Sequence, residues 1–229
     1  MLLLMRYFLI LLVCVFDTYL RVNAQQTSIS FIPTWSNETL ILGKYYPISN
    51  SNDSVRVDVV KFYITNISLW KQGNQVYISP IQHHLINLET NNTIDLNIPQ
   101  QTGYDTIQFF IGIDSITNTS GAMAGDLDAM HGMYWAWQSG YINVKIEGAS
   151  SICNTRKHVF QYHLGGYLSP NQTRQQVAFA MAKQHINITI PFDEILQRQT
   201  LQNTPEVMSP GTQAVINTQR FKRALKSIE

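Results

Sequence analysis

Hydrophobic residues recur along most of this chain in short runs that Asn, Gly, Ser and Pro separate. The runs are rich in Val, Ile, Tyr, Phe and Thr, which is typical of strands; they cover residues 28–33, 55–70, 75–79, 85–88, 93–98, 106–113, 141–147, 157–164 and 186–190. In the longest run both alternating sets of side chains become apolar after Val60, which indicates a strand that enters the middle of a sandwich. The pattern predicts an all-β fold, an antiparallel β-sandwich of immunoglobulin-like or jelly-roll type.

A helical pattern is found only near the end of the chain. Residues 192–198 follow Pro191 and predict a short helix, because proline is favoured at a helix start. Residues 211–228 have the spacing of an amphipathic helix, with Ala214, Val215, Thr218, Phe221, Leu225 and Ile228 on its apolar side. With no internal repeat or low-complexity linker, we expect one β-sandwich domain that ends in a short C-terminal helix.

The first residues are typical of an export signal. The apolar run that ends at Phe16 is too short to span a bilayer, and Val22 and Ala24 are small residues at the positions that a signal peptidase reads. We therefore expect cleavage after Ala24 and a mature domain at 25–229, without a transmembrane segment, in the periplasm, at the cell surface or secreted. An uncleaved signal anchor is the alternative. Cys153 then remains as a lone cysteine, so the core is expected to hold without an intramolecular disulfide.

Composition excludes several classes of function. Hydrophobic residues make up 45% and charged residues 14% of the chain, and the formal net charge is +1. This is too hydrophobic for a disordered chain, and it lacks the basic stripe of a nucleic-acid binder. No GxSxG, GxGxxG or P-loop motif and no distinctive carboxylate pair is present, so we do not expect an enzyme. An enzyme of the cell envelope would need a cleft lined by Asp126, Asp128 and His131; otherwise these two carboxylates are expected to cap turns.

Candidate metal ligands and aromatic side chains are most concentrated in residues 125–148, GDLDAMHGMYWAWQSGYINVKIEG. If this segment is a regular strand, one face carries an imidazole, a thioether and two indoles, from His131, Met133, Trp135 and Trp137. Imidazole and thioether together suit copper, and Cu(I) in particular. A core stripe of Trp and Met is the competing interpretation.

Three further histidines are candidate ligands. His163 lies at the end of a predicted strand, before two glycines that allow a close approach or a sharp turn. His83 and His84 are adjacent, so they point to opposite faces if this piece is extended, and only one of them faces inward.

The central segment resembles the signature of the MbnP-like family, exported proteins named after a methanobactin-associated copper-binding protein. Other stretches resemble the same family and together span about residues 55–215: VVKFYITNISL, HHLINLE, IQFFIGIDSITNTSGAMAGDLD, VFQYHLGGY and PEVMSPGTQA. The resemblance implies a β-sandwich in the periplasm or at the cell surface and copper handling. It also implies, for some members, that a partner di-haem enzyme of the peroxidase type converts a tryptophan to kynurenine, which joins histidines at the copper site.

Carried onto this chain, the resemblance makes Trp135 and Trp137 the tryptophans open to such a modification, and His163 matches the histidine of the HLG motif. The chain lacks the W-x-H arrangement of some copper-binding relatives. The expected function is capture or carriage of copper, with ligands from His131, His163, His83, His84 and Met133 and with a copper donor or acceptor protein as partner. The alternative is an exported, metal-free adhesion or interaction module with the same aromatic block in its core.

Overall fold

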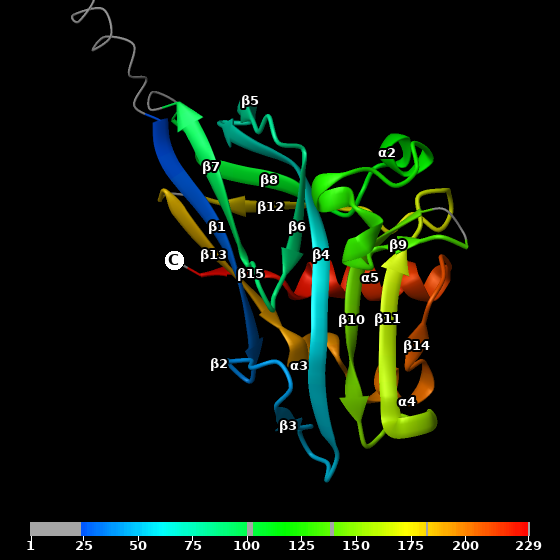
Figure 1. Cartoon of the computed structure of the whole chain (residues 1–229). Coiled ribbons are helices and arrows are strands. Elements are labelled where there is room, and N and C mark those ends of the chain that lie inside the picture. Colours follow the sequence, from blue (N-terminus) through cyan, green and yellow to red (C-terminus); the bar gives the residue numbers. More distant parts are fainter. Residues whose placement is uncertain (1–23, 100–102, 138–139, 182, 229) are drawn as a thin grey trace, which may run out of the picture.

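The 18-residue strand β4 (Ser54–Lys71) is the axis of the fold (Figure 1). One of its edges pairs first with β10 (Gly140–Ser150) and then with β8 (Thr106–Ile111). Its other edge pairs in turn with β3 (Tyr45–Pro47), β6 (His83–Asn87) and β5 (Asn74–Ile78). The ten-stranded sheet is completed by β11 (Val159–Gly165), β14 (Glu206–Val207), β12 (Gln175–Ala180) and β9 (Tyr134–Trp135).

A five-stranded sheet packs against the inner face of the first. It consists of β1 (Ala24–Trp35), β13 (His185–Pro191), β7 (Thr93–Pro99), β2 (Glu38–Thr39) and β15 (Lys226–Ile228). Phe31 of β1 meets Phe62 and Phe109 edge-on, with ring centroids 5.1 and 6.2 Å apart, so aromatic pairs join the two layers. The predicted β-sandwich is confirmed; most pairs are antiparallel, and β1–β13 and β11–β14 are parallel.

The long strand β4 changes which residues face the core. Val55 and Val57 point inward, but a bulge where Gly148 and Glu147 pair with Val57 and Val59 moves the inward positions to Val60 and Phe62. A second irregularity, between Thr65 and Ser68, moves them back to Ile67 and Leu69. A strict alternation along the whole run would therefore misplace the later core residues, because a bulge shifts every later side chain by one face.

All of the predicted strand runs contain a strand, and several short elements were missed. The missed strand β12 is an edge strand with one fully buried side chain, at Val177, so its pattern is weak. The expectation of helix only near the end is also wrong: α2 (Ser115–Thr119) precedes short 3₁₀ turns at Gly125–Leu127 and Ala129–His131, and a third lies at Arg156–His158.

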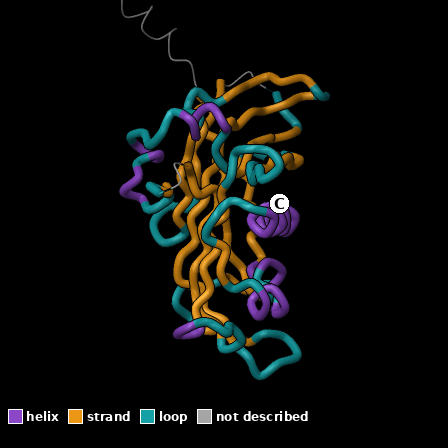
Figure 2. The backbone as a smooth tube through the Cα atoms, turned by 90° about the vertical axis from the view of Figure 1, so that its right-hand side faces the viewer, coloured by secondary structure: helices purple, strands orange, loops and turns teal. Residues whose placement is uncertain are grey.

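The C-terminal region forms α3 (Phe192–Ile195), α4 (Arg198–Asn203) and α5 (Thr212–Ala224). Helix α5 packs on the inner side of the ten-stranded sheet, and its Phe221 lies 5.4 Å from Phe62. Figure 2 shows α5 on one side of the strands and the loop with the first two 3₁₀ turns on the other. The predicted helix does not reach Ile228: it ends at Ala224, because the following residues pair with the open edge of β13 as β15.

The structure, a computed structural model, describes residues 24–99, 103–137, 140–181 and 183–228. The predicted signal segment, apart from its last residue, lies outside these ranges. Within them, no helix is both long and apolar enough to cross a membrane. Cys153 is a free, buried cysteine, as the sequence predicts.

Candidate functional site

A second, smaller hydrophobic cluster covers the outer face of the ten-stranded sheet. We call it the outer cluster; its buried members are Tyr63, Ile113, Leu127, Met133, Trp135, Tyr141 and Ile142. The Tyr141 hydroxyl donates to the Leu127 carbonyl at 3.0 Å, and the Met123 amide donates to that hydroxyl at 3.0 Å. The loop between α2 and β9 is therefore tied onto the sheet by a buried tyrosine.

Trp135 connects this cluster to the paired glycines of β11. A Cβ on Gly165 would lie 2.6 Å from the Trp135 ring and 2.5 Å from the Tyr141 carbonyl, so only glycine fits beneath this indole. Residues two apart share a strand face, so His163 leaves β11 on the same face that Trp135 covers. The MYWAW and HLGGY stretches, which are distant in sequence, are thus packed against each other.

The predicted common face of His131, Met133, Trp135 and Trp137 does not form. Only Tyr134–Trp135 is strand, and Gly132 adopts a left-handed conformation (φ +68°) that ends the preceding 3₁₀ turn. Met133 and Trp135 are buried in the outer cluster, whereas His131 is exposed and Trp137 is 68% exposed. The two indole centroids lie 6.0 Å apart, so the tryptophans remain in contact.

His163 is buried and belongs to a polar group on the outer face of the sheet. Its Nε2 lies 2.6 Å from Oε1 of Glu147, and Lys145 Nζ lies 3.3 Å from the same oxygen. The hydrogen bond from His163 holds the pKa of the Glu147 carboxyl below its ordinary value. Lys145 also donates to the carbonyl of Gly132, and Lys61 donates to the carbonyl of His131 at 3.0 Å. These lysine hydrogen bonds therefore fix the position of the turn that contains His131.

His83 and His84 lie together in a depression at the edge of the outer face. The depression has a volume of about 480 Å³, and the other residues lining it are Ile81, Gln82, Met123, Ala124, Asp126 and Leu127. Both residues line this depression although they are neighbours on β6, which begins at His83. Met123 adds a thioether that is 48% exposed.

The environment of the depression disfavours the charged form of both imidazoles. Burial lowers the pKa of both His83 and His84 below the ordinary value. Nε2 of His84 is buried and has no hydrogen-bond partner among the described residues. A buried nitrogen without a partner costs free energy, and a lone pair free of a proton is what a metal ion requires.

The loop from Gly121 to Gly132 forms the far wall of the depression. Asp126 accepts a hydrogen bond from the Leu85 amide at 2.8 Å, and its carbonyl accepts one from the Tyr63 hydroxyl. Asp128 accepts from the Met130 amide and caps the second 3₁₀ turn, as predicted. His131 turns its Nε2 to the Gly125 carbonyl at 3.1 Å. The structure does not bring Asp126, Asp128 and His131 into a shared cleft.

No group of three or more His, Cys, Asp or Glu side chains in the described ranges could hold a metal ion together. Two histidines and a methionine line the same depression, a mixed set of donor types outside that definition. Met123 was not among the predicted ligands, although it lies in the GAMAGDLD stretch; a lone methionine in a loop gives no periodic signal.

Comparisons with known proteins match the sequence resemblance. The family model described as MbnP matches residues 24–209, which is most of the chain. The chain belongs to the MbnP family. Among solved structures, "MbnP from Methylosinus trichosporium" is similar with a TM-score of 0.65; the match covers 85% of this chain and 88% of that chain. At 14% identity, this second likeness shows the shared fold alone. A comparison with curated proteins gives no match.

Proposed function

We propose that this MbnP-family chain is an exported copper-binding protein that captures or carries copper outside the cytoplasm and is not an enzyme. The observation that carries the proposal is the depression that joins His83, His84 and Met123. Imidazole and thioether donors favour Cu(I) over calcium, magnesium or manganese. The sequence resemblance, which implies copper handling and export, supports the same conclusion.

The donors fit a copper ion in their protonation as well as in their type. Copper binds a neutral imidazole, so a histidine with a raised pKa would lose affinity near neutral pH. The lowered pKa values of His83 and His84 avoid this competition. In this proposal His84 and His83 supply nitrogens and Met123 a soft sulfur. Asp126 keeps the loop with Met123 close through its bond to the Leu85 amide.

Copper donor or acceptor proteins are proposed partners, since a carrier must be loaded and emptied. If a di-haem peroxidase-type partner oxidises a tryptophan here, Trp137 is the accessible candidate, at 68% exposed against 5% for Trp135. An intact mass of the protein from its native host, followed by peptide mapping, tests for conversion of one tryptophan to kynurenine.

The copper site is tested by anaerobic titration of the purified protein with Cu(I) against a chromophoric Cu(I) chelator. We expect about one copper per chain and at least a tenfold loss of affinity in His84→Phe, which corresponds to about 1.4 kcal/mol. Met123→Leu is expected to weaken Cu(I) and to leave Cu(II) binding nearly unchanged, because the thioether selects the softer ion.

Two matched controls and one competing variant sharpen the test. Met130→Leu changes a methionine that is 93% exposed and does not line the depression, and His185→Phe changes an exposed histidine on β13; both are expected to bind as the wild type does. Loss of copper in His163→Ala but not in His84→Phe would move the site to the His163–Glu147 group. No binding at micromolar Cu(I) would refute the proposal.

The second candidate function, a metal-free interaction module, is favoured by one observation. Met133 and Trp135 are packed in the outer cluster, as a structural role for this block requires. The same titration decides between the two functions, because an interaction module has no reason to bind one Cu(I) per chain.

A further inference from the structure

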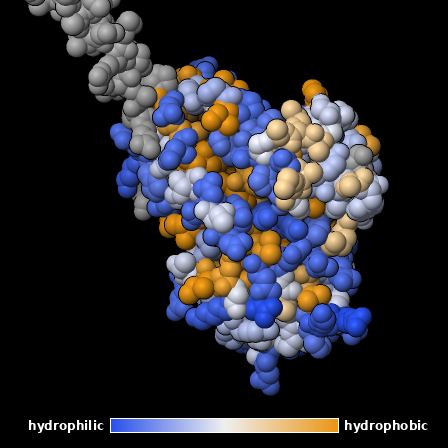
Figure 3. Space-filling view, viewed as in Figure 1, coloured by the Kyte–Doolittle hydropathy of each residue, from blue (hydrophilic) through white to orange (hydrophobic). Residues whose placement is uncertain are grey.

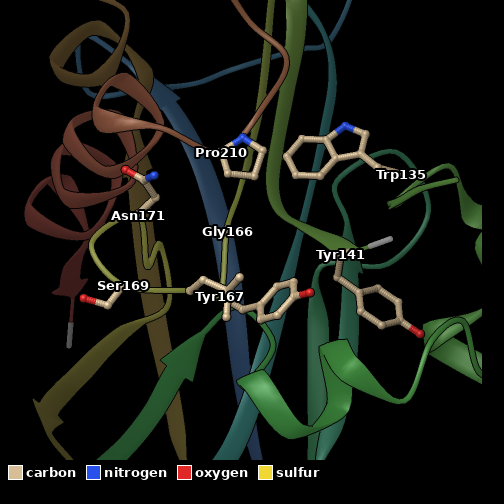
Figure 4. Close-up of a pocket in the computed structure, with 9 residues that line it drawn as sticks. Trp135, Tyr141, Gly166, Tyr167, Ser169, Asn171 and Pro210 are labelled. Atoms are coloured by element: carbon tan, nitrogen blue, oxygen red, sulfur yellow. The ribbon is translucent and has the colours of Figure 1, made fainter. Parts of the chain in front are cut away.

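A second cavity, separate from the histidine depression, opens beside Trp135 (Figure 4). Its volume is about 370 Å³, within the range of roughly 300–1,000 Å³ that is usual for small-molecule sites. The indole of Trp135 and the ring of Pro210 lie on one side of it, and Tyr167, Ser169 and Asn171 lie around the other. The function proposed above makes no use of this cavity.

The shape of the cavity is set by backbone that has little freedom to move. Gly166 has a φ of +138°, and a Cβ at this position would lie 2.2 Å from the Asn171 carbonyl, so the loop folds closely back on the end of β11. The Asn171 amide donates to the Leu168 carbonyl at 2.8 Å, and the Thr173 amide donates to the Gly166 carbonyl at 3.0 Å. The cavity is therefore preformed, which lowers the cost of binding a ligand.

The lining is divided into an apolar wall and a polar edge. Pro210 and the half-buried ring of Tyr167 give hydrocarbon surface, whereas Trp135, at 5% exposed, adds only a small part of its indole. The Ser169 hydroxyl, the Asn171 amide group and the Tyr167 hydroxyl give donors and acceptors. None of these three polar groups is hydrogen-bonded through its side chain to another described residue, so they are available to a ligand. No described residue that lines the cavity carries a formal charge. An anion or a cation would therefore find no partner to offset its lost hydration.

Exposed apolar side chains extend the cavity outward. Leu168 is 65% exposed and lines it, and Trp137 is 68% exposed and lies against Trp135 with centroids 6.0 Å apart. Figure 3 shows a small group of moderately hydrophobic residues, in pale orange, at the upper right of this face, with hydrophilic residues around it.

We propose that this cavity binds an uncharged sugar unit of a saccharide. A pyranose has one face of C–H bonds, which packs on the rings of Tyr167 and Pro210, and an edge of hydroxyls, which pairs with amide and hydroxyl groups. The division of the lining into a flat apolar wall and a neutral polar edge matches this ligand class. This site is independent of the proposed copper site.

The test is saturation-transfer NMR on the purified protein with glucose, galactose, mannose and N-acetylglucosamine as separate probes. We expect saturable transfer to at least one sugar, strongest at its C–H face, and at least a tenfold weaker affinity in Asn171→Ala. Asn74→Ala, at an exposed position on β5, is the matched control and should bind as the wild type does.

A second variant protects the test against a folding defect. Leu168→Arg changes a residue that is 65% exposed, so it is expected to leave the thermal midpoint unchanged while it places a charged group at the mouth of the cavity. Transfer that disappears in Leu168→Arg supports the proposal. No transfer to any of the four sugars, or transfer that neither Asn171→Ala nor Leu168→Arg weakens, overturns it. Copper binding is expected to be the same in both variants, so the failure of either proposal leaves the other standing.

Discussion

The contact between Trp135 and Gly165 leads to a sharp prediction about stability. In Gly165→Ala the new methyl group would lie 2.6 Å from the indole and 2.5 Å from the Tyr141 carbonyl. The indole belongs to a packed cluster, and the carbonyl belongs to strand β10, so neither can retreat without moving backbone. Overpacking of this kind costs about 1–3 kcal/mol, and two close contacts place this variant at about 3 kcal/mol.

The assay is urea unfolding followed by tryptophan fluorescence and by circular dichroism. A loss of about 3 kcal/mol in the free energy of unfolding corresponds to a fall of about 6–12 °C in the thermal midpoint for a domain of this size. Gly211→Ala is the matched control, because a Cβ there meets nothing within 4 Å and the backbone is extended. Gly211 is the N-cap of α5, where alanine is less favourable than glycine, so its cost should stay at or below about 1 kcal/mol.

A double variant separates the ring contact from general strain. Trp135→Leu removes the indole edge, so Gly165→Ala should cost less in that background than in the wild type, since contacting residues are not additive. The destabilisation that Gly165→Ala still causes in the Trp135→Leu background measures the clash with the Tyr141 carbonyl. A Gly165→Ala protein as stable as the control would show that Trp135 does not rest on this glycine and would refute the reasoning.

Two further predictions follow from the titrating groups. Because the pKa of Glu147 is lowered in the folded protein, its carboxylate stabilises the fold fully above its ordinary pKa of 4.5, and this stability is lost as the pH falls through the folded value. Glu147→Gln should therefore flatten the acid side of a curve of unfolding free energy against pH. An unchanged acid side would contradict this assignment. Burial raises the pKa of the Cys153 thiol to about 11, so an aromatic disulfide reagent at pH 8 should label it only after unfolding; stoichiometric labelling of the native protein within seconds would show that the thiol is accessible.

The sequence by itself determined the fold class, because burial on a sheet imposes a period of two that is visible in single runs such as residues 186–190, where Ile186, Ile188 and Ile190 are buried. It also determined the family, since the MYWAW and HLGGY stretches are long enough to be recognised. It correctly predicted turn-capping by Asp128, which depends on local geometry and on side-chain type.

Only the tertiary structure decided which candidate ligands meet. The regular strand expected for residues 131–141 is broken at Gly132, so His131 and Trp137 lie on the surface while Met133 and Trp135 are buried. Met123 joins His83 and His84 because Asp126 ties its loop to β6, a contact between residues 41 positions apart. Periodicity reports which face of a strand is buried; it carries no information about which loop folds over that face, because loop placement depends on hydrogen bonds and packing between distant segments.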